Sequence, residues 1–303
     1  MIGSGVAGSG VTGSGVSGSD MDGEYVAVPG EYLSGGARLG FSDAGEGLPV
    51  ILLHPTPLDR EYWHPLTREL AGIRAIVPDL RGHGHSELGK GLPTGGFTRV
   101  PGAPVLTMAQ FAADIIALLD HLKISNAVFG GCSIGGYAML ELWRRAPQRV
   151  RGMIFVCSKP QPDAEANLAK RIDTIARARA DGVDALFDGM AQNMVAPPIR
   201  KERPEVVAEV RAQMTLTAEA VVAVQAGLAA RPDSVPTVAT IHVPVLAIAG
   251  AEDATVTAAD MAAFRAAPGG CEFHVIPCAG HFAAYEQPKK VAAIVAPWLR
   301  QFE

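Results

Sequence analysis

The segment that most constrains the fold of this chain is Gly131-Cys-Ser-Ile-Gly135, which stands between a strand-like stretch and a helix-like stretch. The apolar run 127–130 precedes it, and a helical pattern follows it to about Arg145. Glycine and serine are common residues, so Gly-x-Ser-x-Gly alone is weak evidence. Between a strand and a helix, however, it is typical of a sharp turn that presents the serine above the end of the strand. We therefore predict that Ser133 is a nucleophile; the alternative is a glycine-rich turn without a chemical role.

Strand-like and helix-like patterns alternate along most of the remaining chain. One helix is expected to begin at Thr107, where Thr107-x-x-Gln110 has the form of a capping box, and a closing helix is expected from about Gln287 to Gln301. Because amphipathic helices separate short apolar strands, we predict an α/β fold with a mostly parallel central sheet and helices on both faces. The predicted strands cover residues 37–42, 50–54, 75–78, 127–130, 153–157, 245–249 and 273–277.

Two stretches interrupt this alternation. Residues 158–238 contain no convincing strand, and their apolar residues recur at helical spacing, so we predict a helical cap inserted before the last two strands. Residues 88–104 are rich in glycine and proline and are predicted to form a long surface loop. The core of the fold would then consist of residues 24–157 and 239–303.

The first 23 residues have a different composition from the rest of the chain. They repeat a Gly-Ser-Gly-Val pattern, which is typical of a disordered, flexible tail. They lack the basic start and the apolar stretch of a signal peptide, and no apolar run reaches the roughly 18 residues that a membrane span requires. We therefore expect a cytoplasmic protein. An alternative is that translation starts at Met21, which would leave the tail outside the native protein.

Charge and cysteine content restrict the possible partners. Lys and Arg number 26 and Asp and Glu number 31, so the net charge of −5 does not favour nucleic acid or an anionic membrane as a partner. The four cysteines form no Cys-x-x-Cys pair, which argues against a disulfide scaffold or a zinc site. No flavin or nicotinamide fingerprint is present. We expect a small-molecule substrate and no cofactor or metal, and the sequence leaves the oligomeric state open.

A serine nucleophile requires a base and a carboxylate that orients the base. On a turn of this kind the three groups follow in the order Ser, Asp or Glu, His. His281 follows the predicted strand 273–277, and Asp253 follows the predicted strand 245–249. We predict that His281 is the base and that Asp253 orients it, with the adjacent Glu252 as the alternative carboxylate.

The negative charge that develops on a carbonyl oxygen during attack requires two hydrogen-bond donors. One candidate is the backbone N–H of Ile134, directly after the serine. The other should come from the loop after strand 50–54, where Pro55 and Pro57 have no N–H. Thr56 is therefore the second predicted donor of the oxyanion hole. In the alternative interpretation, the two prolines only stiffen the turn.

Taken together, these motifs resemble the α/β-hydrolase superfamily. The resemblance rests on His54-Pro55, Asp79-Leu-Arg-Gly-His-Gly-His-Ser86, Gly131-Cys-Ser-Ile-Gly-Gly136, Asp253 and Gly280-His281, and it extends from about residue 31 to residue 303. It implies an eight-stranded, mostly parallel sheet, a triad of Ser133, Asp253 and His281, and a structural turn over residues 81–86 rather than a metal site at His83 and His85. The chain departs from the family pattern at Pro55, where the family usually has glycine.

Within the superfamily, the chain most resembles the esterases, enol-lactonases and cofactor-free haloperoxidases with a helical cap. We therefore predict a serine hydrolase that cleaves a small, largely apolar carboxylic ester or lactone through an acyl-enzyme. Two alternatives stay open: a carbon–carbon bond hydrolase or perhydrolase that uses the same triad, and a non-catalytic ligand sensor on the same fold.

Overall fold

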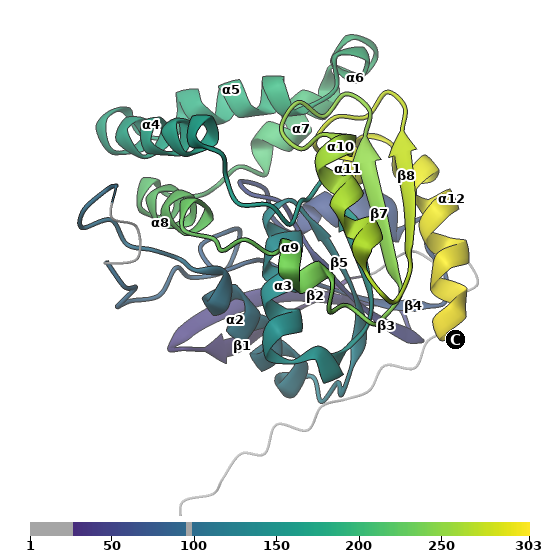
Figure 1. The fold of residues 1–303 in the computed structure, drawn as a ribbon. Helices are drawn as coiled ribbons and strands as arrows, with labels where there is room; N and C mark the ends of the chain where they lie inside the picture. Colours follow the sequence, from purple (N-terminus) through teal and green to yellow (C-terminus); the bar gives the residue numbers. More distant parts are fainter. Residues whose placement is uncertain (1–26, 95–98) are drawn as a thin grey trace, which may run out of the picture.

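The computed structural model describes residues 27–94 and 99–303, and these residues fold around one eight-stranded sheet (Figure 1). The predicted tail over residues 1–23 lies outside the described ranges. The strands are β1 Val28–Ser34, β2 Ala37–Ala44, β3 Leu48–Leu53, β4 Ile73–Pro78, β5 Ala127–Cys132, β6 Val150–Val156, β7 Val245–Gly250 and β8 Cys271–Ile276.

The strand order is β1-β2-β4-β3-β5-β6-β7-β8. The pairs β1–β2 and β2–β4 are antiparallel, and the five remaining pairs are parallel. Strands β3, β5, β6 and β7 are almost wholly buried, as their continuous apolar sequences predict for a sheet covered on both faces. The predicted fold class, a mostly parallel sheet of eight strands, is confirmed.

The strand that the sequence analysis missed is β1. Its sequence, Val-Pro-Gly-Glu-Tyr-Leu-Ser, contains two residues that are uncommon in strands. Proline is tolerated because β1 lies at the edge of the sheet, where no further strand needs its N–H. Gly30 is required because the Phe41 ring occupies the space of a side chain: a Cβ at Gly30 would lie 2.3 Å from the ring.

Helices cover both faces of the sheet. A Cβ at Gly152 in β6 would contact Trp298 and Phe302 at the C-terminus, whereas Phe155 in the same strand lies against Gly136. Residues 152 and 155 are separated by an odd number of positions and therefore point to opposite faces. The segment that contains Gly136 thus covers one face of β6, and the C-terminal segment covers the other.

The helix expected after Thr107, the helix expected after Ser133 and the closing helix expected from about Gln287 to Gln301 are all present. The Thr107 side chain accepts a hydrogen bond from the Gln110 N–H and caps the helix that follows it. The helices of the core are α1 His64–Thr67, α2 Met108–His121, α3 Ile134–Arg145, α10 Ala258–Met261, α11 Ala283–Glu286 and α12 Pro288–Leu299. Short 3-10 helices cover Arg60–Trp63, Pro147–Arg149, Ala262–Ala266 and Arg300–Phe302.

A wholly helical insertion separates β6 from β7. It consists of α4 Glu165–Asp181, α5 Asp184–Met194, α6 Pro197–Glu202, α7 Glu205–Ala212, α8 Ala218–Ala229 and α9 Val235–Val238. Figure 1 shows α5 and α6 beyond the arrowheads of β7 and β8, at the carboxyl edge of the sheet. The predicted insertion of helices before the last two strands is therefore confirmed, while the division of the chain into separate core and cap units stays a prediction.

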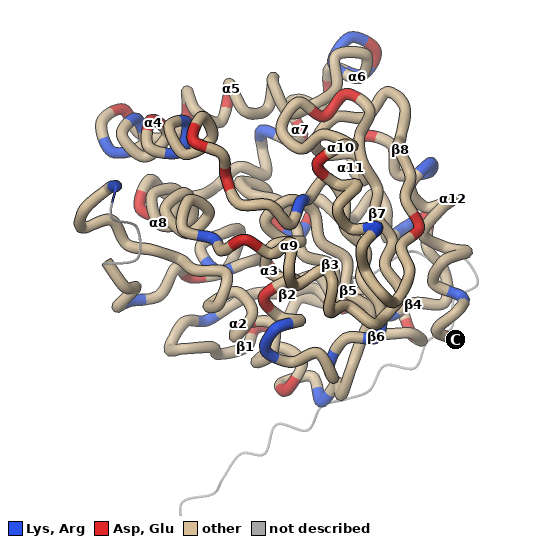
Figure 2. Tube along the Cα trace, in the orientation of Figure 1, with Lys and Arg blue, Asp and Glu red and all other residues tan. Residues whose placement is uncertain are grey.

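Charged residues of both signs are distributed over all layers of the fold. Figure 2 shows Lys and Arg interspersed with Asp and Glu along the chain, without an extended segment of a single sign. Among the described residues, no helix has the length and apolar character needed to cross a membrane.

Candidate active site

Ser133 occupies the turn between β5 and α3, with φ 51° and ψ −114°. This left-handed conformation is costly for a residue with a side chain and is concentrated at functional positions. The flanking glycines permit the turn. A Cβ at Gly131 would lie 2.6 Å from the Gly136 nitrogen, and a Cβ at Gly135 would lie 2.3 Å from the Leu53 carbonyl oxygen. The two glycines of the motif are thus required by close backbone contacts.

The backbone of Ser133 is fixed by the neighbouring strand β6. The Ser133 N–H donates to the Val156 carbonyl at 3.2 Å, and the Ser158 hydroxyl donates to the Ser133 carbonyl at 2.9 Å. A Cβ at Gly136 would lie 2.3 Å from the Ser158 oxygen. Gly136 therefore makes room for the hydroxyl that holds the Ser133 carbonyl, which gives the third glycine of the segment a structural role.

The structure brings Asp253 and His281 together. His281 Nδ1 lies 2.8 Å from Asp253 Oδ2, and both side chains are buried. The other oxygen of Asp253 accepts hydrogen bonds from the N–H groups of Thr255 and Val256 at 2.7 and 3.0 Å. Burial alone would raise the pKa of Asp253, but His281 and the two N–H groups together lower it below its ordinary value. Glu252, the alternative carboxylate, is exposed to solvent.

Ser133 and His281 line the same cavity, which has a volume of about 290 Å³. Thr56 and Pro57 form another part of its wall. The insertion contributes Met190 and Met194 from α5, and further residues from α4 and α8. The cavity therefore lies between the carboxyl edge of the sheet and the inserted helices, the position expected for a ligand site in an open α/β sheet.

The two predicted oxyanion donors both belong to segments that border this cavity. Within residues 27–94 and 99–303, no hydrogen bond uses the backbone N–H of Thr56 or of Ile134. Ile134 is the first residue of α3, where unpaired N–H groups and the helix dipole favour negative charge. One of these two N–H groups follows Ser133 in the chain and the other belongs to a residue in the wall of the same cavity, so both are candidates to donate to a developing oxyanion.

Two histidines that the sequence analysis did not include in the site hold the Thr56 loop. His83 Nε2 lies 2.9 Å from the Thr56 hydroxyl, and His83 Nδ1 lies 3.0 Å from the Arg81 carbonyl. The Leu80 N–H donates to His54 Nε2 at 2.8 Å. Burial lowers the pKa of His54 to about 4 and that of His83 to about 3, so both rings are neutral at pH 7.

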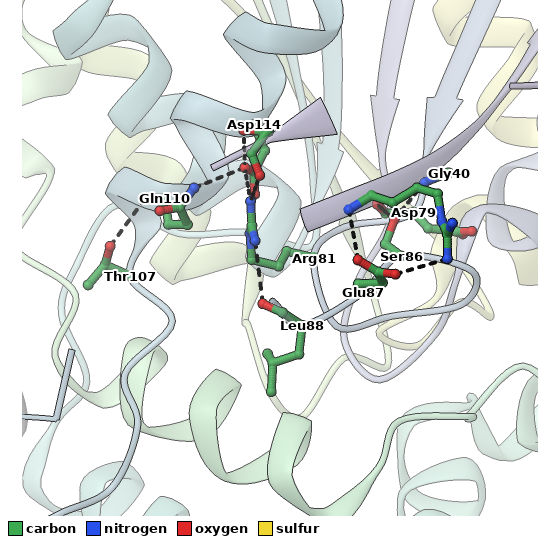
Figure 3. A network of polar contacts seen from close by, with 11 residues as sticks. Gly40, Asp79, Arg81, Ser86, Glu87, Leu88, Thr107, Gln110 and Asp114 are labelled. Atoms are coloured by element: carbon green, nitrogen blue, oxygen red, sulfur yellow. Dashed lines mark hydrogen bonds and ion pairs between the residues drawn. The ribbon is translucent and has the colours of Figure 1, made fainter. Parts of the chain in front are cut away.

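The turn that carries His83 is anchored by a buried ion pair. Figure 3 shows Arg81 between the Asp114 carboxylate and the Leu88 carbonyl, with Gln110 also directed at Asp114. Arg81 donates two hydrogen bonds to Asp114 at 2.6 and 2.9 Å. Residues 79–86 therefore form a structural turn. The sequence signal that could have identified His83 as a partner of the Thr56 loop is its position within this turn.

A buried carboxylate, Glu286, holds the His281 loop against the insertion. Its oxygens accept hydrogen bonds from the N–H groups of Ala196, Gly280 and Phe282 at 2.9 to 3.1 Å. In addition, the His281 N–H donates to the Met194 carbonyl at 2.9 Å. Burial is the main cause that raises the pKa of Glu286, and the three N–H groups oppose it. The sequence analysis missed this residue because nothing in its local pattern distinguishes it from a surface glutamate.

The rest of the cavity is more polar than the predicted apolar substrate would require. Lys159, Asp163, Lys170 and Arg171 belong to its lining, together with the amides of Asn167 and Gln225. Lys159 and Asp163 lie in the segment between β6 and α4, and Lys170 and Arg171 lie in α4. The charged residues of the cavity therefore come from the inserted helices and from the segment that leads into them.

Two residues near the site, Cys132 and Trp63, are buried. Cys132 is fully buried, with its Sγ 3.6 Å from the His281 carbonyl oxygen, and burial raises its pKa, which disfavours the thiolate. Trp63 is buried in the core and is not part of the cavity wall. Among the described residues, no cluster of three or more His, Cys, Asp or Glu side chains could hold a metal ion.

Comparison with known proteins identifies relatives of this chain. The model of the alpha/beta hydrolase family matches residues 50–294. An esterase from Thermogutta terrifontis, solved in a malate-bound form, is 32% identical, with a TM-score of 0.81 over 91% of this chain and 99% of that one. The 3-oxoadipate enol-lactonase 2 of Acinetobacter baylyi is 29% identical over 240 residues, which cover 75% of this chain and 79% of that protein.

Other similarities are confined to part of the relative. The non-heme chloroperoxidase of Streptomyces lividans is 33% identical over 132 residues, which cover 42% of this chain and 43% of that protein. The chain thus spans less than half the length of several curated relatives that it matches.

Proposed function

This chain belongs to the alpha/beta hydrolase family, and we propose that it is a serine hydrolase that cleaves a carboxylic ester or lactone through an acyl-enzyme. The observation that carries the proposal is the 2.8 Å contact between Asp253 and His281 at a cavity that Ser133 also lines. An esterase and an enol-lactonase among the relatives support ester or lactone chemistry in particular.

In the first half-reaction, the Ser133 hydroxyl attacks the carbonyl carbon of the substrate. Because the His281 Nδ1–H donates a hydrogen bond to Asp253 and keeps its proton, the lone pair of the ring is on Nε2, which accepts the serine proton. Asp253 has a lowered pKa and therefore remains ionised beside the imidazolium. The N–H groups of Thr56 and Ile134 donate to the oxyanion of the tetrahedral intermediate.

The intermediate then collapses. The carbon–oxygen bond to the leaving alcohol breaks, and the alkoxide takes the proton from His281 Nε2. Ser133 now carries the acyl group as an ester. For a lactone, the leaving alcohol stays attached to the acyl chain, and the same proton transfer applies.

In the second half-reaction, His281 takes a proton from a water molecule, whose oxygen attacks the acyl carbon. The second tetrahedral intermediate uses the same two N–H donors. Its collapse breaks the bond to Ser133 Oγ, which recovers its proton from His281 and releases the carboxylic acid. The enzyme returns to its starting state without a cofactor in the reaction.

Labelling with a fluorophosphonate probe tests the proposal. We expect rapid modification at Ser133, identified by peptide mass spectrometry, and no labelling of the Ser133→Ala variant. Hydrolysis of short p-nitrophenyl esters should also be lost in Ser133→Ala, while the far-UV circular dichroism spectrum is unchanged. Undiminished hydrolysis by Ser133→Ala would refute the proposal.

Assays with different substrates distinguish the alternative functions. A panel of short p-nitrophenyl esters, enol-lactones and aryl dienoates separates ester or lactone hydrolysis from carbon–carbon bond hydrolysis, and added hydrogen peroxide tests perhydrolysis. A folded protein that neither reacts with the probe nor turns over any member of the panel would instead be a ligand sensor.

A further inference from the structure

Lys159 is a buried cation of the cavity for which the described part of the chain provides no charged partner. It follows β6, is only 9% exposed, and lines the cavity together with Ser133 and His281. Within residues 27–94 and 99–303, no hydrogen bond or ion pair involves its ammonium group. A buried cation without a partner is costly, since lysine is almost never buried unless it is paired.

Asp163, which lines the cavity, and Asp253, which contacts His281, are both already engaged. The Asp163 carboxylate pairs with Arg171 through one oxygen and with Arg231, at 2.8 Å, through the other. Asp253 is occupied by His281 and by two backbone N–H groups. Neither carboxylate is left to neutralise Lys159.

The balance of charge in the cavity is therefore positive. Its lining contains the cations Lys159, Lys170 and Arg171 but only one acid, Asp163. Lys170 is exposed to solvent, so water screens its charge, and Arg171 already pairs with Asp163. Lys159 alone combines burial, a free ammonium group and a place in the cavity wall.

We propose that Lys159 binds a carboxylate group of the substrate. The substrate class would then be small esters or lactones that carry a carboxylate apart from the scissile carbonyl, in place of the largely apolar substrate that the sequence predicts. A cavity of about 290 Å³ suits a small molecule, and one free ammonium matches one carboxylate. This inference rests on the proposed function, because it assigns a role to another wall of the same cavity.

The test compares ligands that differ by one charge. A neutral ester, p-nitrophenyl butyrate, serves as the reporter, and the dicarboxylates from succinate to adipate are each compared with their own monoamide as inhibitors. In the wild-type protein, the best-fitting dicarboxylate should inhibit at least about tenfold more strongly than its monoamide, since the monoamide loses the charge that strengthens a hydrogen bond to the ammonium group.

Variants then test whether Lys159 causes the preference for the dicarboxylate over its monoamide. In Lys159→Met the preference should fall by at least about tenfold, and Lys159→Arg should restore part of it. In Lys170→Met, which removes an exposed cation of the same cavity, the preference should change by less than about threefold. Circular dichroism and thermal unfolding of each variant establish that it is folded.

The outcomes separate this inference from the proposed function. A wild-type protein that hydrolyses the reporter but does not prefer any dicarboxylate over its monoamide overturns the inference alone, and so does a preference that survives Lys159→Met. A folded protein that hydrolyses neither the reporter nor any other member of the substrate panel, and that does not react with the fluorophosphonate probe, contradicts the proposed function. The same pairs of ligands are then measured by titration calorimetry on the full-length wild-type and Lys159→Met proteins, where the same loss of preference is expected.

Discussion

Asp253 and His281 lie 28 residues apart in the chain, and their side chains are joined by a 2.8 Å contact. Each follows a strand, and these two strands, β7 and β8, are adjacent and parallel. The carboxyl ends of parallel strands meet at one edge of a sheet, so the loops after them converge. The turn after β5 brings Ser133 to the same edge, which is why the cavity contains both Ser133 and His281.

The role of the Asp253 carboxylate in catalysis can be tested by comparison with the exposed carboxylate of Glu252. Asp253→Asn should lower kcat by about 10⁴-fold with a small effect on KM, because an amide does not hold the imidazole in the productive tautomer or stabilise the imidazolium. The matched control is Glu252→Gln, which changes an exposed carboxylate one residue away and should leave kcat within about twofold. Equal effects of the two substitutions, measured by steady-state ester hydrolysis, would contradict this assignment.

The hydroxyl of Thr56 is predicted to position the oxyanion loop. Thr56→Val keeps the backbone N–H and the shape of the side chain but leaves His83 Nε2 without its partner. We expect a loss of about 1–3 kcal/mol in the free energy of unfolding and a decrease of kcat by about tenfold, less than the 10²–10³ lost when an oxyanion donor is removed.

Thr56→Ser retains the hydroxyl and provides the control. It should restore both the stability and most of the activity. If Thr56→Val matched the wild type in kcat and in urea unfolding, the contact with His83 would have no part in shaping the site.

Stability should fall on acidification because His54 is buried in its neutral form. Its pKa is lowered to about 4 in the folded protein, against about 6.5 in the unfolded chain, so the unfolded chain binds more protons between these values. The stabilisation is fully present above pH 6.5 and is lost as the pH falls toward 4, by about 3 kcal/mol.

Urea unfolding at pH 7.5 and pH 4.5 measures this dependence. His54→Gln, which keeps an acceptor but has no proton to gain, should show a weaker loss of stability on acidification than the wild type. His85→Gln changes an exposed histidine of the same region and should behave as the wild type does. If His54→Gln lost as much free energy of unfolding between pH 7.5 and pH 4.5 as the wild type does, other groups would govern the acid sensitivity.

Glu286 is expected to hold the His281 loop in place. Glu286→Ala leaves three buried N–H groups without an acceptor, and each such group costs about 1–3 kcal/mol. We expect Tm to fall by about 6 °C or more, at about 2–4 °C per kcal/mol for a domain of this size, together with a decrease in kcat.

The control for Glu286 is Glu272→Ala, which removes an exposed carboxylate of β8. Its Tm should change by about 1 °C or less. If Glu286→Ala were as stable and as active as this control, the three hydrogen bonds would contribute nothing to the loop.

Local sequence patterns were sufficient wherever a conformation depends on neighbouring residues. The glycines at 131 and 135 predict the turn because only glycine fits its close contacts, and Thr107 predicts a helix start because its side chain caps an N–H three residues later. The same reasoning missed β1, since Pro29 and Gly30 argue against a strand locally. Only the edge position and the Phe41 ring make that strand possible.

The sequence by itself determined seven of the eight strands, the turn at Ser133, and the choice of His281 as the candidate base. Only the tertiary structure shows that Asp253 contacts His281 while Glu252 is exposed, assigns His83 and Glu286 to their partners, and leaves Lys159 buried in the cavity without a partner. The physical reason is that periodicity and turn chemistry act between neighbours in the chain. Hydrogen bonds and burial in the site, by contrast, join residues that are distant in sequence, and they exist only once the sheet has brought its strand ends together.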